Sequence, residues 1–216
     1  MIELVTRELQ HVREAYDDFR TFRREFDAEH GKDIDGAIHR DRLDRQRQKL
    51  KSKIGYVSQH FALYRDMSVR ENLAYFAAMH KIPAAKTGEL IGKYAHELGF
   101  SEYLDAMPQD IPLGINQRFS IAAAIMHEPV VLFLDEPTSG VDAMARGQFW
   151  ELLKELKQKW KIAILITTHY MSEAEYCDRV VLLKEGKKVA DEHLQALYEM
   201  HPKAKNFEDI FMEYYQ

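Results

Sequence analysis

Two adjacent carboxylates, Asp135 and Glu136, directly follow the apolar run "VVLFL". Such a run predicts a buried strand, and parallel sheets bind their ligands at the carboxyl ends of the strands. One carboxylate there suits a magnesium ion held partly through water, and the next suits a base that orients an attacking water. The pair indicates metal-assisted hydrolysis. The alternative is an acid that caps the strand end and has only a structural role.

Polar residues also end two other predicted strands. Gln59 ends "IGYVSQ", and His169 ends "KIAILITTH". Because the carboxyl ends of parallel strands meet at one edge of a sheet, both side chains are expected near Asp135 and Glu136. A lone histidine is usually structural. At this shared edge, however, we interpret His169 as a phosphate contact.

The segment "PTSGVDA" predicts a tight turn followed by a helix. Pro137 and Gly140 favour the turn, and Asp142 stands where it can cap the helix "DAMARGQFWELLKELKQKW". Capping alone would account for Asp142.

Short apolar runs alternate with helical patterns from Ile54 onward. Ser68 and Glu71 have the spacing of a capping box before a helix. Further along, "SEAEYC" predicts a short helix and "DRVVLLKEGKKVA" a hairpin that turns at Glu185-Gly186. The alternation predicts an α/β fold in which helices cover both faces of a mostly parallel sheet.

The first 53 residues have a different pattern, because they are highly charged and lack long apolar runs. Apolar residues spaced three or four apart predict an N-terminal amphipathic helix with a narrow seam, at Ile2, Val5, Leu9, Val12, Tyr16, Phe19, Phe22 and Phe26. This helix either docks on its own domain or pairs with another helix. Gly31 and Gly36 end the pattern, and "HRDRLDRQRQKLKSK" predicts a solvated helix or connector.

Composition excludes several classes of protein. The chain has 216 residues, a net charge of −5 and one cysteine, Cys177. One cysteine forms no internal disulfide, and the first residues have no leader pattern, so we expect a cytoplasmic protein. Its apolar runs are too short to span a membrane, so a membrane role requires a partner. The acidic balance gives no general electrostatic footprint for nucleic acid, so we expect no nucleic-acid partner, and a local basic patch is the alternative.

Three segments together resemble the nucleotide-binding domain of an ABC transporter ATPase: "IGYVSQ", "LGINQRFSIAAAIMHEPVVLFLDEPTSGVDA" and "ITTHYMSEAEYCDRVVLLKEGK". The resemblance covers about residues 54–197. It is closest to the drug-exporter branch, particularly the second ATPase half of fused proteins of the ribosome-associated ATPase type. It implies a partial RecA-like P-loop NTPase core at 54–197, with an α-helical subdomain at about 68–128. The charged segment at 1–53 precedes this core, and a C-terminal helical tail at 198–216 follows it.

The resemblance also implies roles for individual residues. Glu136 is the general base, His169 the switch histidine and Gln59 the Q-loop glutamine, which with Asp135 serves the Mg²⁺ ion. Contacts to ATP are implied at Gly114, Gln117, Ser139, Gly140 and Asp142. The implied partners are a membrane permease and a second ABC ATPase domain, which would hold the protein at the inner face of the cell membrane.

Two departures from the family pattern affect this expectation. The signature segment reads Ile111, Pro112, Leu113, Gly114 and Ile115, so the serine of the family's Leu-Ser-Gly-Gly-Gln is absent. Gly114 and the start of the following helix can still offer backbone N–H groups to a phosphate.

The second departure is the phosphate loop. A Gly-Lys-Ser/Thr ending is not found upstream of Gln59, where Gly31-Lys32 is followed by aspartate. The family's first strand is also expected to be missing, whereas "DIDGAIHRDRLDRQRQKLKSK" is compatible with the ordinary approach to Gln59. The leading hypothesis is therefore an ATPase component that couples ATP hydrolysis to export. The alternatives are a partner deficient in nucleotide binding and a truncated domain that acts as a non-hydrolytic interaction module; whether the isolated chain is an enzyme stays open.

Overall fold

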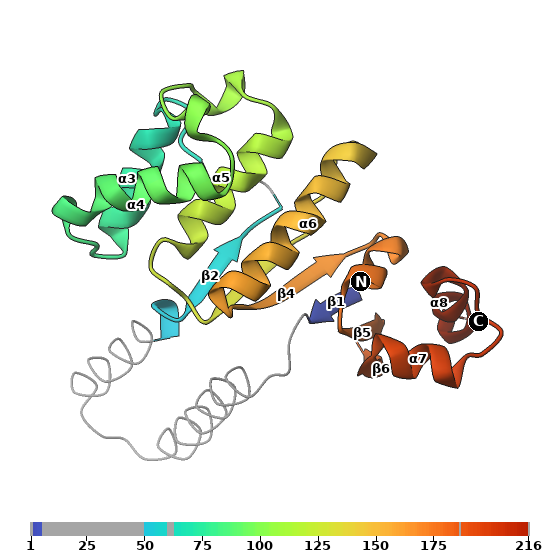
Figure 1. The fold of residues 1–216 in the computed structure, drawn as a ribbon. Coiled ribbons are helices and arrows are strands. Elements are labelled where there is room, and N and C mark those ends of the chain that lie inside the picture. Colours follow the sequence, from blue (N-terminus) through green and yellow to red (C-terminus); the bar gives the residue numbers. More distant parts are fainter. Residues whose placement is uncertain (1, 6–49, 60–62, 186, 216) are drawn as a thin grey trace, which may run out of the picture.

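Six strands form one mixed sheet in the order β2-β3-β4-β1-β5-β6 (Figure 1). The structure is a computed structural model, and it describes residues 2–5, 50–59, 63–185 and 187–215. Strands β2 (Ile54–Val57), β3 (Val131–Asp135) and β4 (Ala163–Thr168) are parallel neighbours. Strands β5 (Arg179–Lys184) and β6 (Lys187–His193) form the predicted antiparallel hairpin.

Strand β1 (Ile2–Val5) lies between β4 and β5 and is antiparallel to both. The predicted helix is therefore wrong for these four residues, and the rest of its seam lies outside the described residues. The expectation that the family's first strand, which precedes the phosphate loop, is missing stays a prediction, because β1 runs antiparallel to β4. Strands β4 and β5 are separated by the width of one strand. Their facing backbone N–H and C=O groups need hydrogen-bond partners, and β1 pairs with both strands.

The direction of β1 determines which edge of the sheet its last residue, Val5, lies toward. Ile2 is opposite Thr168 and Val5 is opposite Leu165. The strand therefore starts beside the carboxyl end of β4 and ends toward its amino end. As a result, Val5 lies toward the edge opposite to the one where Glu136 and His169 follow their strands.

Two groups of helices lie at opposite ends of the sheet (Figure 1). One group contains α3 (Val69–Met79), α4 (Ala84–Glu97) and α5 (Leu113–Ile125), with short 3-10 turns at Ser101–Tyr103 and Pro108–Asp110. The other contains α7 (Leu194–Met200) and α8 (Phe207–Tyr215). The subdomain and tail boundaries expected at 68–128 and 198–216 stay predictions.

The described residues also contain the long helix α6 (Ala143–Trp160) and the 3-10 helix η3 (Met171–Tyr176). Two helix starts follow the capping chemistry of the sequence. The Ser68 hydroxyl accepts from the backbone N–H of Glu71 while the Glu71 carboxylate accepts from that of Ser68, as a capping box requires. Asp142 Oδ1 accepts from the backbone N–H groups of Met144 and Ala145, each at 2.9 Å.

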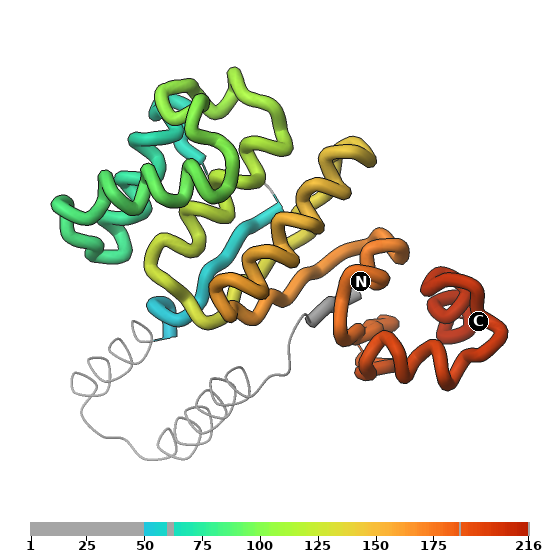
Figure 2. The backbone as a smooth tube through the Cα atoms, in the orientation of Figure 1, coloured from blue at the N-terminus to red at the C-terminus, as the bar shows by residue number. Residues whose placement is uncertain are grey.

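Helices α5 and α6 lie side by side near β2 (Figure 2). The sheet face on their side is apolar and buried, with Val57, Leu132, Leu134, Ile164 and Ile166 in the core. On the opposite face Tyr56 is exposed and Phe133 and Leu165 are half-buried. Within the described residues, the predicted cover of both faces is therefore incomplete over β2–β4. No helix in the described part of the chain is long and apolar enough to cross a membrane.

Candidate functional site

Three residues predicted to share one sheet edge contact each other there. Glu136 Oε2 accepts a hydrogen bond of 2.7 Å from Gln59 Nε2 and lies 3.2 Å from His169 Nδ1. Gln59 follows β2, Glu136 follows β3 and His169 follows β4. The glutamate carboxylate is therefore held between an amide and an imidazole that come from the neighbouring strands.

Asp135 ends β3 beside this group and accepts hydrogen bonds from two hydroxyls. Thr167 Oγ1 donates to Asp135 Oδ1 at 2.6 Å, and the Tyr56 hydroxyl donates to Oδ2 at 3.3 Å. Partial burial and the nearby Asp135 charge raise the pKa of Tyr56, so its hydroxyl stays protonated. Both hydroxyls therefore bond the Asp135 carboxylate and fix its orientation.

The backbone of Glu136 has a left-handed conformation, with φ +45°. A non-glycine residue there costs on the order of 1 kcal/mol, which the surrounding bonds must offset. The Glu136 N–H donates to the Thr167 carbonyl at 3.0 Å and lies 3.2 Å from Thr167 Oγ1. Thr167 thereby fixes both acids of the pair.

The turn after Glu136 contains three of the residues assigned to ATP by resemblance. The Ser139 N–H donates to the Glu136 carbonyl at 3.1 Å, and Gly140 has φ +76°, a conformation that suits glycine. Asp142 is exposed and caps α6. Capping explains the position of Asp142, and the nucleotide contacts of all three residues stay predictions.

The amino end of α5 lies against this turn. Gln117 is 2% exposed, and its Nε2 donates to the Pro137 carbonyl. A Cβ placed on Gly114 would lie 3.6 Å from Ala145 Cβ, and one on Gly140 would lie 4.0 Å from Leu113 Cδ2. The segment aligned with the family signature therefore packs against the turn after Glu136, and Gln117 holds that turn in place.

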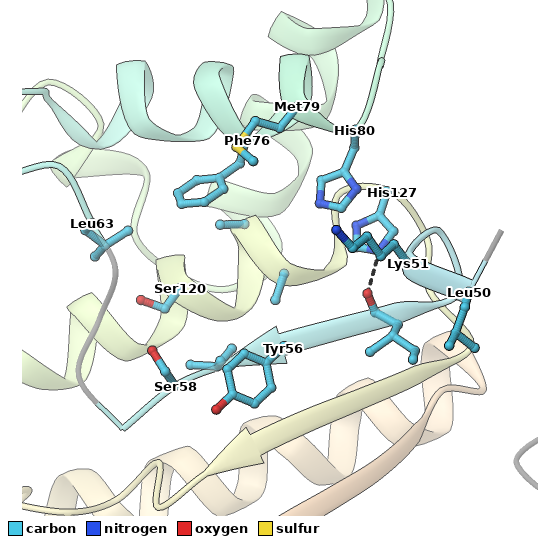
Figure 3. A pocket seen from close by; sticks show the side chains of 14 residues that line it. Leu50, Lys51, Tyr56, Ser58, Leu63, Phe76, Met79, His80, Ser120 and His127 are labelled. Atoms are coloured by element: carbon cyan, nitrogen blue, oxygen red, sulfur yellow. Dashed lines mark hydrogen bonds between the residues drawn. The ribbon is translucent and has the colours of Figure 1, made fainter. Parts of the chain in front are cut away.

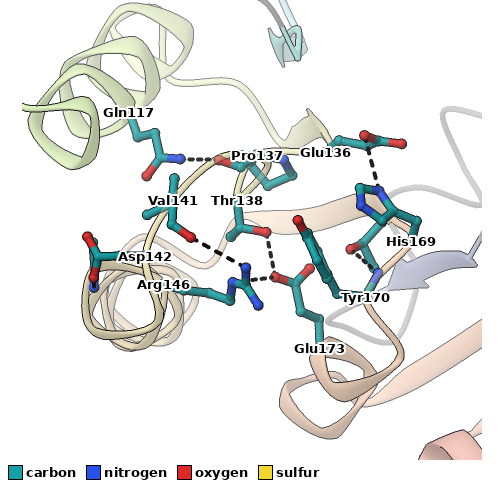
Figure 4. A network of polar contacts seen from close by, with 12 residues as sticks. Gln117, Glu136, Pro137, Thr138, Val141, Asp142, Arg146, His169, Tyr170 and Glu173 are labelled. Carbon is teal, nitrogen blue, oxygen red and sulfur yellow. Dashed lines mark hydrogen bonds and ion pairs between the residues drawn. The ribbon is translucent and has the colours of Figure 1, made fainter.

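A second polar network lies behind the turn (Figure 4). Thr138 and Glu173 are both fully buried, and the Thr138 hydroxyl donates to Glu173 Oε1. Arg146 Nε lies 3.8 Å from the same oxygen. The Arg146 guanidinium also lies over the Tyr170 ring, 4.1 Å from its centroid.

A separate pocket of about 460 Å³ lies between β2, α3 and α5 (Figure 3). Its wall includes Phe76, Met79 and the rings of His80 and His127, which stack with centroids 3.7 Å apart. Burial lowers the pKa of both histidines, so the stacked pair is neutral at neutral pH. This lining is mainly apolar and contains no carboxylate, so the pocket does not suit a magnesium-bound triphosphate.

The oxygen ligands of the sheet edge fit a magnesium ion. Magnesium takes oxygen ligands and is commonly bound through one or two carboxylates together with waters and substrate phosphates. Asp135 provides a carboxylate, and Gln59 provides an amide oxygen from the adjacent strand. The described residues contain no cluster of three or more His, Cys, Asp and Glu suited to an all-protein metal site.

Sequence reasoning missed Tyr56, Thr167, Thr138, Arg146 and Glu173. Two of them had a usable signal. Tyr56 precedes Gln59 by three residues, and Thr167 precedes His169 by two. The strand register places Thr167 opposite Asp135.

Comparison with known proteins connects more than half of the chain to one family. Residues 19–139 match the family described as "ABC transporter". The match includes Gln59, Gly114, Gln117, Asp135 and Glu136, and it also includes "DIDGAIHRDRLDRQRQKLKSK". It ends before Gly140, Asp142 and His169.

Individual relatives agree with this match. The probable multidrug ABC transporter ATP-binding protein YbhF of Escherichia coli is 38% identical over 142 residues, which are 66% of this chain and 24% of that protein. The bacitracin export ATP-binding protein BceA of Halalkalibacterium halodurans is 34% identical over 140 residues, 65% of this chain and 55% of that protein. The chain thus spans between about a quarter and about half of the length of these relatives.

A solved structure extends the similarity to the fold. The structure of cbiO1 from Clostridium perfringens, described as part of the ABC transporter complex cbiONQ, superposes with a TM-score of 0.61 at 28% identity. The superposition covers 72% of this chain and 61% of cbiO1. The α/β fold with its parallel strands and helices is the fold of an ABC ATPase.

Proposed function

This chain belongs to the ABC transporter family as an ATP-binding component, and from this premise we propose that it serves an exporter, coupling ATP hydrolysis to transport through a membrane permease. The exporter assignment is supported by the names of YbhF and BceA. The likeness to the second ATPase half of fused ABC proteins is part of the same proposal. The partners would be a permease and a second ABC ATPase domain, and the site of action the inner face of the cell membrane.

The contact group around Glu136 is the observation that carries the proposal. A general base must be ionised and must be aimed at the water it activates. Gln59 and His169 both reach Glu136 Oε2 and limit the rotation of the carboxylate. Glu136 would take the proton of the attacking water, and His169, which is half-exposed, would contact the phosphate that leaves.

Asp135 and Gln59 would hold the magnesium ion at this edge. The bound ion would neutralise phosphate charge and draw electron density from the bond that breaks. The hydroxyls of Thr167 and Tyr56 orient the Asp135 carboxylate for this task. Gly114, Ser139, Gly140 and Asp142 lie on or beside the turn after Glu136 and would contribute to a nucleotide site shared with a second ATPase domain.

The decisive experiment measures hydrolysis in the assembled transporter. We expect the chain to copurify with a permease encoded beside its gene, and we expect the complex to hydrolyse ATP. Glu136→Gln should reduce the turnover rate by at least about 100-fold, because general-base catalysis typically contributes that much or more. Glu151→Gln, on an exposed position of α6, is the matched control and should keep full activity. Failure to form a complex, together with hydrolysis that does not depend on Glu136, would overturn the proposal.

The direction of β1 favours a second candidate, a partner that lacks its own phosphate cradle. A phosphate loop follows a strand whose carboxyl end lies at the catalytic edge, whereas the carboxyl end of β1, at Val5, lies toward the opposite edge. Such a chain would complete an ATP site on a competent second domain without binding nucleotide alone.

Titration calorimetry separates the two candidates. For the isolated 216-residue chain we expect Mg-ATP to bind no more tightly than about 1 mM, because backbone N–H groups that wrap the phosphates supply the dominant contacts. Micromolar binding by the isolated chain would exclude the partner role. Weak binding together with hydrolysis in a heteromeric complex would support it.

A further inference from the structure

Two loops bring the members of the Glu136–His169 contact together. The first is the turn of residues 136–142, between β3 and α6, and the second is the segment of residues 169–176, which follows β4 and includes η3. The 3.2 Å distance between Glu136 Oε2 and His169 Nδ1 depends on how these loops are held relative to each other. Register along β3 and β4 fixes only the points at which the loops leave the sheet.

Glu173 joins the two loops from inside the protein. It belongs to η3, has no exposed surface, and accepts a hydrogen bond from the hydroxyl of Thr138 in the first loop. Its other carboxylate oxygen, Oε2, is buried without a hydrogen-bond partner in the described structure. Burying a carboxylate costs several kcal/mol unless it is well paired, so this arrangement is not explained by stability alone.

Arg146 supplies the charge that faces Glu173 and contacts both loops itself. Its guanidinium donates to the carbonyl of Val141 at 3.4 Å in the first loop, and it stacks over Tyr170 in the second. Tyr170 is the direct neighbour of His169, and the two rings are 4.2 Å apart. The contacts therefore lead from the turn after Glu136 through Arg146 and Glu173 to the backbone that carries His169 (Figure 4).

We propose that Glu173 and Arg146 are positioning residues that hold these two loops at the spacing required for the Glu136–His169 contact. Neither residue touches the reacting atoms. Glu173 acts on the turn through Thr138, and Arg146 acts on His169 through Tyr170. The consequence for hydrolysis rests on the proposed function, whereas the spacing of the loops does not.

The chain offers a matched control on the same helix. Lys157 of α6 forms an ion pair with Asp178, two residues beyond η3. This pair also joins α6 to the chain after β4, and it contacts neither the turn of residues 136–142 nor His169. Asp178→Asn therefore removes an ion pair between α6 and the chain after β4, and it should leave the loop spacing unchanged.

NMR of the full chain with labelled histidine rings tests the spacing directly. The His169 signal is identified by its loss in His169→Ala, and its displacement by Glu136→Gln reports the contact between the two side chains. We expect this displacement to be mostly lost in Glu173→Gln and Arg146→Met and fully kept in Asp178→Asn. An equal displacement in all backgrounds would overturn the proposal, as would an equal loss in Asp178→Asn.

Two further measurements keep the outcome decisive. If Glu173→Gln fails to fold, Thr138→Val, which removes only the hydroxyl that donates to Glu173, should reduce the displacement in the same direction, and an unchanged displacement would contradict the proposal. The NMR result needs neither nucleotide nor permease. If the NMR result contradicts the proposal while the complex still hydrolyses ATP in a Glu136-dependent way, this inference alone is rejected. If the NMR result is as expected but the complex does not hydrolyse ATP, the proposed function alone is rejected.

Discussion

Asn72 is fully buried, and both ends of its side-chain amide bond to backbone. Its Oδ1 accepts from the Tyr64 N–H at 2.9 Å, and its Nδ2 donates to the carbonyls of Tyr64, Met67 and Ser68 at 2.9–3.0 Å. These bonds fix the loop of residues 64–68 ahead of α3. We expect Asn72→Ala to lower the free energy of unfolding by about 2–4 kcal/mol, since it leaves several buried backbone groups unsatisfied.

Urea denaturation measures this loss. Lys86→Ala, at an exposed position of α4, is the control and should change the free energy of unfolding by less than about 0.5 kcal/mol. A loss for Asn72→Ala as small as that of the control would mean that the loop is not held by the asparagine.

Asp191 gives the stability a dependence on pH with a defined sign. Hydrogen bonds from Arg179 and Lys188 lower the pKa of the Asp191 carboxyl in the folded protein. The stabilisation is therefore present above the ordinary aspartate pKa of about 4 and is lost as the pH falls through the lower folded value.

Asp191→Asn should accordingly destabilise the protein at pH 7, with a difference from the unchanged chain that shrinks below about pH 4. Thermal unfolding at a series of pH values checks this, with Glu192→Gln on the same strand as the control. A difference that is constant from pH 7 to pH 3 would show that the charge of Asp191 is not the cause.

Sequence reasoning found the residues that follow strands and missed those that reach them from the side. Gln59, Glu136 and His169 each end a recognisable apolar run, so their common location follows from parallel strand geometry. Glu173 and Arg146 stand in helical segments with no sign of burial in their sequence. Their meeting depends on how η3 packs against α6, which a linear pattern does not encode.

At the scale of elements, the approach of β2 to α5 depends on Gly55. A Cβ at this position would lie only 2.4 Å from the Ala124 carbonyl oxygen of α5. Gly55→Ala must push the strand and helix apart or strain both, and we expect a loss of about 1–3 kcal/mol in the free energy of unfolding. Gly92→Ala in α4, where the added methyl meets nothing within 4 Å, should instead stabilise the protein by about 0.5–1 kcal/mol.

Denaturation of the two variants under the same conditions is the measurement, and opposite signs are the expected result. If both substitutions stabilise the protein, the close contact at Gly55 is wrong. Because Gln59 follows β2, the Gly55 variant should also weaken the hold of Gln59 on Glu136.

Local rules predicted most elements from β2 onward, and they failed at β1. The caps at Ser68 and Asp142 and the β5–β6 hairpin follow from side-chain chemistry within a few residues. Ile2 and Val5 fit a helical spacing equally well, but the structure pairs them with β4 and β5. The strand conformation depends on pairing with strands more than 150 residues away, so the periodicity of the first 53 residues could not predict it.

At the scale of the whole molecule, the direction of β1 determines whether a segment that follows this central strand is placed to bind a phosphate. A strand parallel to β4 would deliver the following residues to the edge where Asp135 and Glu136 lie. In the observed antiparallel strand, Val5 lies toward the other edge. The proposed dependence on a second ATPase domain for phosphate contacts thus rests on the direction of a four-residue strand.

Disulfide cross-linking of introduced cysteine pairs measures the direction of β1 relative to β4. In the antiparallel register Val5 is directly opposite Leu165, while Ile2 is opposite Thr168. Opposed residues of antiparallel strands have Cα atoms about 4.5–5.5 Å apart, within the range a disulfide spans. With Cys177 replaced by serine, Val5→Cys with Leu165→Cys should cross-link under mild oxidation, and Ile2→Cys with Leu165→Cys should not. The reverse result, read on a non-reducing gel, would mean that β1 runs parallel to β4, and a phosphate loop after it would then be on the correct edge.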